Sequence, residues 1–100
     1  MDISILNNKM TIEGDVELNE LNDLTEYFNK LFQSKERDIV INFHNMRRIK
    51  SPLIAKILIL NQSLSKIGKN LSIRTNNTDI YEIFFVLKLQ NIIDIKKYDI

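Results

Sequence analysis

The side chains best suited to binding or chemistry lie in one short stretch, residues 44–51. It reads His-Asn-Met-Arg-Arg-Ile-Lys-Ser, and Pro52 follows. A polar turn with three cations attracts an anionic ligand or the acidic surface of a partner protein. Ser51 and Pro52 also favour the start of a helix, with Ser as the N-cap and Pro at the first helical position. We therefore expect any functional site at this turn and at the start of the helix that follows it.

Charge is distributed unevenly along the chain, although the net charge is only +1. Residues 1–38 hold four basic and nine acidic residues, residues 39–78 hold seven basic and no acidic residues, and residues 79–100 hold three basic and four acidic residues. One interpretation of the basic middle third is a solvated surface whose acidic partners lie on the first helix. The other is a surface for an anionic ligand or an acidic partner. Nucleic acid is not expected, because the basic residues are few and lack interleaved aromatic residues.

The composition argues against several kinds of active site. The chain has no Cys, which removes thiol nucleophiles, disulfides and thiolate metal sites. His44 is the only His and has no second His, Cys or carboxylate at ligand spacing, so we expect it to be a turn residue. Two glycines do not make a phosphate-binding loop, and no nucleophile–base pair is visible. We expect a protein that is not an enzyme and that needs no metal or cofactor.

The sequence also bears on location. The first ten residues are too polar for a signal peptide. No apolar run approaches the roughly 20 residues that cross a bilayer. We therefore expect a cytoplasmic protein with no direct membrane insertion.

Hydrophobic periodicity predicts elements in the order β-β-α-β-α-β-α-β. Asn7-Asn8 suits the turn of an opening hairpin, because Asn tolerates left-handed backbone angles. Gly68 should end the second helix, and Asp79 with Glu82 should form a reciprocal cap on the third. This order predicts an α/β fold with a mixed sheet of four or five strands flanked by helices, in a single domain over residues 1–100. The expected strands are residues 3–6, 9–13, 38–43, 71–74 and 92–95, the expected helices are residues 18–33, 51–67 and 79–87, and residues 96–100 are unassigned.

Helical spacing separates the faces of the first two helices. Two residues of the second helix, Ala55 and Ile59, fall on its polar side. Ile59 is either an isolated exposed residue or part of a partner-facing patch with Lys56 and Ser51. The expected core positions are Leu18, Leu21, Leu24, Phe28, Leu31 and Phe32 on the first helix, and Leu53, Ile54, Ile57, Leu60, Leu64 and Ile67 on the second.

Four stretches resemble the STAS domain, the fold of bacterial anti-sigma factor antagonists and of the cytoplasmic tails of sulfate transporters. Thr11–Asp15 looks like the family's opening, a strand followed by Gly and then Asp or Glu, and residues 38–49 look like its central strand and turn. Residues 50–55 stand where family members carry a pattern close to D-S-S-G-L-G. Ile83–Ile95 looks like the third helix and last strand. The resemblance covers most of the chain and implies a STAS-like fold.

By this resemblance Ser51 stands where a partner kinase phosphorylates anti-sigma antagonists. The implied function is that of a non-catalytic interaction module whose partner is an anti-sigma factor or serine kinase-like protein. The partner-binding surface would then consist of Arg48, Lys50, Ser51, Ala55, Lys56 and Ile59. The chain departs from the family at Lys50, Pro52 and Leu53, and Lys88 replaces the glycine after the third helix. The family's C-terminal helix is missing or very short.

Two other functions remain open. A STAS subunit of a membrane complex would use the same helix face to dock constitutively on the ATPase of a phospholipid transporter, without phosphorylation. A small enzyme or an anion-binding domain would use the basic turn itself. The sequence does not identify the partner or the oligomeric state.

Overall fold

The computed structural model describes residues 1–99, and its elements follow the predicted order. Two short 3₁₀ turns, η1 and η2, precede α1 and β5. Over these described residues the fold is α/β, with a five-stranded mixed sheet and three α-helices. The strands are β1 (Asp2–Leu6), β2 (Lys9–Glu13), β3 (Asp38–His44), β4 (Asn70–Thr75) and β5 (Asp94–Lys97), and the helical elements are η1 (Leu18–Glu20), α1 (Leu21–Phe32), α2 (Ser51–Lys66), α3 (Thr78–Val86) and η2 (Leu89–Asn91).

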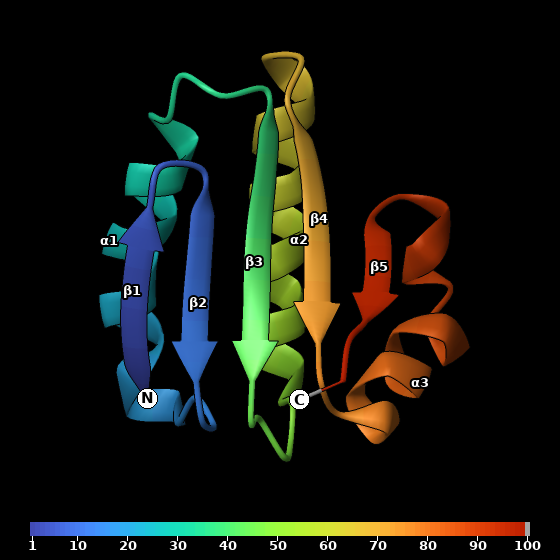
Figure 1. Cartoon of the computed structure of the whole chain (residues 1–100). Helices are drawn as coiled ribbons and strands as arrows, with labels where there is room; N and C mark the ends of the chain where they lie inside the picture. Colours follow the sequence, from blue (N-terminus) through green and yellow to red (C-terminus); the bar gives the residue numbers. More distant parts are fainter. Residues whose placement is uncertain (100) are drawn as a thin grey trace.

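The strands lie side by side in the order β1-β2-β3-β4-β5 (Figure 1). β1 pairs antiparallel with β2 through a tight turn in which Asn7 has a φ of 57°, as predicted for this hairpin. The other neighbouring pairs are parallel, and each connection between them contains a helix. The carboxyl ends of β2 to β5 therefore meet at one edge of the sheet. The turn from β3 into α2 lies at this edge.

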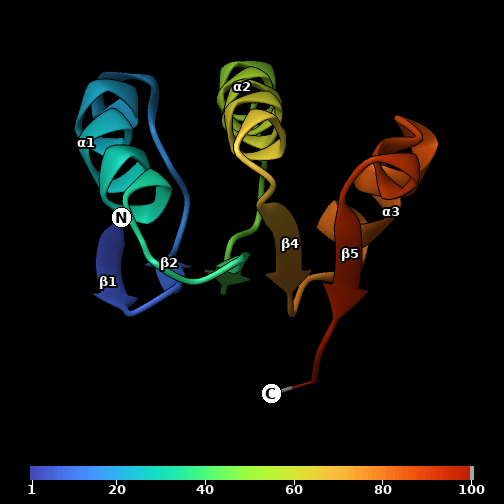
Figure 2. The ribbon, with the colours of Figure 1, turned by 90° about the horizontal axis from the view of Figure 1, so that it is seen from above.

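All three helices cover the same face of the sheet (Figure 2). Side chains alternate along each strand, so one set points toward the helices and the other away from them. The helix-facing set of β3, which is Ile39, Ile41 and Phe43, is fully buried. The buried positions of α2 are Leu53, Ile57, Leu60 and Leu64, which confirms the predicted face of that helix except at its ends. Ile54 is half-buried and Ile67 is 49% exposed.

Several predicted boundaries and positions were wrong. Leu18 belongs to η1 rather than to α1 and is exposed, and Phe32 is also partly exposed at the end of α1. The last strand begins at Asp94 rather than Ile92, because the N–H group of Ile93 is still bonded to the carbonyl of Leu89 in the preceding 3₁₀ turn, at 2.9 Å. Apolar character alone had suggested a strand at Ile92, which is exposed.

The cap of α3 also differs from the prediction. Asn77 is the N-cap, and its Oδ1 accepts a hydrogen bond from the N–H group of Ile80 at 3.0 Å. Asp79 lies inside the first turn instead. The helix starts earlier because the short Asn side chain already satisfies a free N–H group at its beginning.

Lys88, the residue after the C-cap of α3, adopts left-handed backbone angles with a φ of 61°. A side chain with a Cβ is strained in this region, whereas Gly is not. We expect Lys88→Gly to raise the free energy of unfolding by about 0.5–1 kcal/mol, measured by chemical denaturation. The matched change Lys66→Gly, in the last turn of α2, should lower it by a similar amount. Destabilisation by both substitutions would show that the backbone at Lys88 is not strained.

Candidate functional site

The turn between β3 and α2 is held in place by its neighbours at the carboxyl edge of the sheet. Asp15, in the loop after β2, accepts hydrogen bonds through Oδ1 from the N–H groups of Arg47 (2.7 Å) and Arg48 (3.2 Å). The N–H group of Asn45 donates to Oδ1 of Asn76 at 2.9 Å. The turn therefore has a fixed shape that depends on side chains from two other loops.

These contacts lower the pKa of the Asp15 carboxyl group below its ordinary value of 3.8. The main cause is the hydrogen bond from the Arg47 N–H group, and the Arg48 N–H group and both guanidinium charges act in the same direction. Partial burial acts against them, because it disfavours the charged form. Asp15 is therefore ionised at neutral pH and offsets part of the charge of the basic turn.

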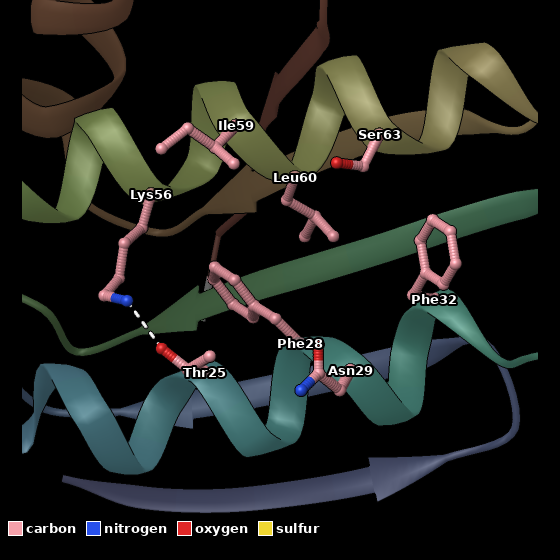
Figure 3. Close-up of a pocket in the computed structure, with 8 residues that line it drawn as sticks. All are labelled: Thr25, Phe28, Asn29, Phe32, Lys56, Ile59, Leu60 and Ser63. Atoms are coloured by element: carbon pink, nitrogen blue, oxygen red, sulfur yellow. Dashed lines mark hydrogen bonds between the residues drawn. The ribbon is translucent and has the colours of Figure 1, made fainter.

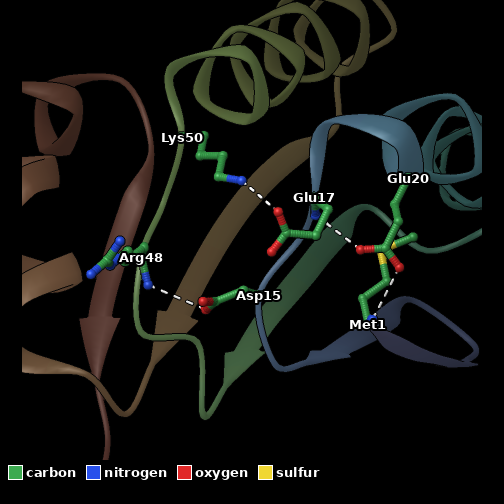
Figure 4. A network of polar contacts seen from close by, with 6 residues as sticks. All are labelled: Met1, Asp15, Glu17, Glu20, Arg48 and Lys50. Carbon is green, nitrogen blue, oxygen red and sulfur yellow. Dashed lines mark hydrogen bonds and ion pairs between the residues drawn. The ribbon is translucent and has the colours of Figure 1, made fainter.

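A chain of charged groups continues from the turn to the first residue (Figure 4). Lys50 Nζ pairs with Glu17 Oε2 at 2.6 Å, and the Glu17 N–H group donates to Glu20 Oε1 at 2.9 Å. Glu20 Oε2 pairs with the amino group of Met1 at 3.1 Å, and the pKa of Glu20 is lowered, first by the Glu17 N–H group and then by this amino group. The acidic partner of Lys50 thus precedes η1 and does not lie on α1, as one interpretation had expected.

Ser51 does not cap α2, contrary to the prediction. The N-cap is Lys50, whose carbonyl accepts hydrogen bonds from the N–H groups of Leu53 (3.0 Å) and Ile54 (3.2 Å). Pro52 lacks an N–H group and suits either of the first two helical positions, so it did not decide between Ser51 and Lys50 as the cap. Starting at Lys50 gives the helix one more backbone hydrogen bond. Ser51 is exposed in the first turn.

Three of the predicted partner-binding residues form a line along α2. Ser51, Ala55 and Ile59 are four residues apart, which places them on one side of the helix, and all three are exposed. Ile59 is 62% exposed. We refer to these three residues as the α2 ridge.

The other three predicted residues point elsewhere. Lys56 lies toward α1, where its Nζ bonds to Thr25 Oγ1 at 2.5 Å. Lys50 is held by Glu17. Arg48 is exposed, and its side chain points away from Lys50 (Figure 4). The structure therefore brings Ser51, Ala55 and Ile59 together, places Lys56 beside them and separates Arg48.

A groove between α1 and α2 was not predicted (Figure 3). We refer to it as the α1–α2 groove; its volume is about 280 Å³. Ile59 of the ridge forms part of one wall. Helical spacing assigned Phe28, Phe32 and Leu60 to the core, but it could not show that two helices leave a gap there. The lining residues are Thr25, Phe28, Asn29, Phe32, Lys56, Ile59, Leu60 and Ser63.

His44 lies at the end of β3, half-buried, and not in the turn where we expected it. Its Nδ1 shares a hydrogen bond with the hydroxyl group of Tyr98 at 2.7 Å, and the two rings are stacked. Burial raises the pKa of Tyr98. Within residues 1–99, no group of three His, Cys, Asp or Glu side chains is arranged to hold a metal ion.

None of the helices formed by the described residues is both long and apolar enough to span a membrane. A comparison of the chain with models of known protein families finds no match, and a comparison with curated proteins finds none.

Proposed function

We propose that this protein is a non-catalytic interaction module of the STAS type, acting as an anti-sigma factor antagonist. It binds an anti-sigma factor or a serine kinase-like protein through the start of α2. The observation that carries the proposal is the α2 ridge, which presents a hydroxyl group, a small side chain and an exposed Ile in one line. A hydroxyl group at the edge of an apolar contact suits a surface whose affinity changes with modification.

The fold supports the STAS resemblance. The order β-β-α-β-α-β-α-β and the mixed five-stranded sheet are compatible with the α/β fold class that the resemblance implies. Lys88 supports it as well, because this residue adopts the left-handed conformation that favours the glycine of the family.

The position of Ser51 suits a phosphorylation switch. Its hydroxyl group is exposed and is not needed as a helix cap, so modification would cost the fold little. A phosphate in the first turn of α2 would lie at the positive end of the helix, which favours negative charge. It would also add about −1.5 to −2 charges to the ridge, enough to weaken an apolar contact with a partner.

A second function, constitutive docking on the ATPase of a membrane transporter, is favoured by one observation. Lys50 replaces the acidic residue before the acceptor hydroxyl and is paired with Glu17, so the surroundings of Ser51 differ from the family pattern. A partner that docks permanently needs the ridge but not the hydroxyl group.

The two functions differ in the effect of charge at Ser51. In capture from the native cell followed by mass spectrometry, we expect wild type and Ser51→Ala to retain an anti-sigma factor of kinase type. Ser51→Asp should weaken that complex about tenfold or more, which corresponds to about 1.4 kcal/mol. Both variants should keep the stability of wild type within about 0.5 kcal/mol, because Ser51 is exposed and does not cap the helix.

Intact-mass measurement before and after phosphatase treatment tests the modification itself. A single unmodified mass across growth conditions, with equal capture of a transporter ATPase by both variants, would support constitutive docking instead. Capture of neither class of partner would contradict both functions.

A further inference from the structure

The α1–α2 groove has an apolar floor and two partly exposed walls. Phe28 from α1 and Leu60 from α2 form the floor, and each is only 6% exposed. Phe32 on α1 (37% exposed) and Ile59 on α2 (62% exposed) also line the groove and are more exposed (Figure 3). Water in such a groove contacts mostly carbon, so an occupant with apolar side chains would gain free energy by displacing it.

The spacing of the lining residues suits a helix. On each of the two helices, the residues that line the groove recur every three or four positions. The helices α1 and α2 run in the same direction, because each connects one parallel strand to the next. From Lys56 to Ser63 a helix rises about 10 Å, which is two turns. A partner helix with apolar residues at positions i, i+3 or i+4, and i+7 would match this length. An extended strand would find no free strand edge here, because both walls are helices whose backbone groups are already bonded.

The lining of the groove includes one positively charged side chain, whose hydrogen-bond partner is neutral. Of the described residues, Lys56 is the only charged one that lines it, and its Nζ bonds to the hydroxyl group of Thr25. Among residues 1–99 no carboxylate lies within ion-pair distance of Lys56, and α2 contains no acidic residue. A carboxylate on the occupant would therefore meet an unopposed positive charge.

We propose that the α1–α2 groove binds one amphipathic helix of the partner protein, with its apolar side chains on Phe28 and Leu60 and an Asp or Glu carboxylate at Lys56. The inference rests on the proposed function, because Ile59 belongs to both the α2 ridge and the groove. It deepens that function by giving the partner's chemistry and by adding α1 to the interface.

The test selects binders from a displayed library of amphipathic helical peptides of about 18 residues, long enough to form helix. The target is the full chain. We expect selected peptides to share apolar residues at helical spacing and at least one Asp or Glu. In NMR spectra of the labelled protein, the selected peptide should shift the amide signals of Thr25, Asn29, Lys56 and Ser63.

Charge reversal gives the matched control. Lys56→Glu should weaken the binding of the acidic peptide about tenfold or more. It should affect much less the binding of the same peptide with Gln in place of its acidic residue. Lys66→Glu, on α2 but outside the groove, should change binding by no more than about twofold, because exposed charges at that distance are screened. Phe32→Glu should also weaken binding while leaving the α2 ridge intact.

The inference would be overturned if no peptide is selected or if the selected peptides lack acidic residues. It would also be overturned if the peptides shift amide signals of α3 in place of those around the groove. Displacement of the peptide by a fatty acid but not by a second acidic helix would overturn it too. If Phe32→Glu leaves partner capture unchanged while Ser51→Asp weakens it, the groove is not the site but the proposed function stands. If acidic helices bind the groove and the captured protein belongs to neither expected class, the inference stands and the proposed function fails.

Discussion

Replacing Leu64 by Ala is expected to lower the free energy of unfolding by about 2–5 kcal/mol, the range for truncating a buried Leu. Leu64 is fully buried and lies in the core that α2 shares with the sheet. Removing its branched end leaves a cavity, because the helix cannot move inward without disturbing the residues beside it. Unfolding in urea, monitored by circular dichroism, measures the loss.

The control for this prediction lies on the same helix. Ile59→Ala also removes aliphatic carbon from α2, but Ile59 is 62% exposed, so the change should stay within about 0.5 kcal/mol. A loss well below 1 kcal/mol for Leu64→Ala, or equal losses for the two variants, would mean that the buried face of α2 is assigned wrongly.

Replacing Asp15 by Ala should lower the free energy of unfolding by about 1.5–3 kcal/mol, the range for hydrogen bonds to a charged group. The change removes the acceptor of two N–H groups in the turn before α2. Asp15→Asn keeps one oxygen acceptor without the charge and should lose less. Asp2→Ala, at an exposed position in β1, should change stability by no more than about 0.5 kcal/mol.

The Asp15 contribution should depend on pH in one direction. The pKa of Asp15 is lowered in the folded state, so its stabilisation is fully present above the ordinary value of 3.8 and is lost as the pH falls through the lowered folded pKa. The stability difference between wild type and Asp15→Asn should therefore shrink on acidification over this range. Glu20 is present in both proteins, so its own lowered pKa cancels from the difference. A difference that stays constant or grows toward low pH would contradict the Asp15 contacts.

The order of elements could be predicted because strands and helices differ in the period of their apolar residues, and because turn residues mark where they end. Val40, Ile41 and Phe43 mark the buried strand, and Gly68 follows α2 with the expected positive φ. The two predicted helix caps were wrong, since Ser51 and Asp79 are common cap residues but Lys50 and Asn77 hold those positions. Which residue caps a helix depends on the backbone angles at its first few residues, and the residue type alone does not determine those angles.

The candidate site could be predicted only where it lies on one element. The α2 ridge follows from the helical period of a single segment, so Ser51, Ala55 and Ile59 could be placed together. Contacts between distant segments could not be predicted. Asp15 reaches Arg47 across 32 residues, and the groove exists only because α1 packs beside α2 without filling the space between them.

The proposed partner surface on the α2 ridge is tested most directly by making the same substitution, Ile to Asp, at two positions. Ile59 and Ile92 are similarly exposed, at 62% and 58%, but Ile59 lies on the α2 ridge and Ile92 follows η2. Affinity for the captured partner, measured by calorimetric titration, should fall about tenfold or more for Ile59→Asp and stay within about twofold for Ile92→Asp. Both variants should melt within a few degrees of wild type, as expected for exposed positions. Equal affinity for the two variants, or unfolding of Ile59→Asp, would contradict a partner surface on α2.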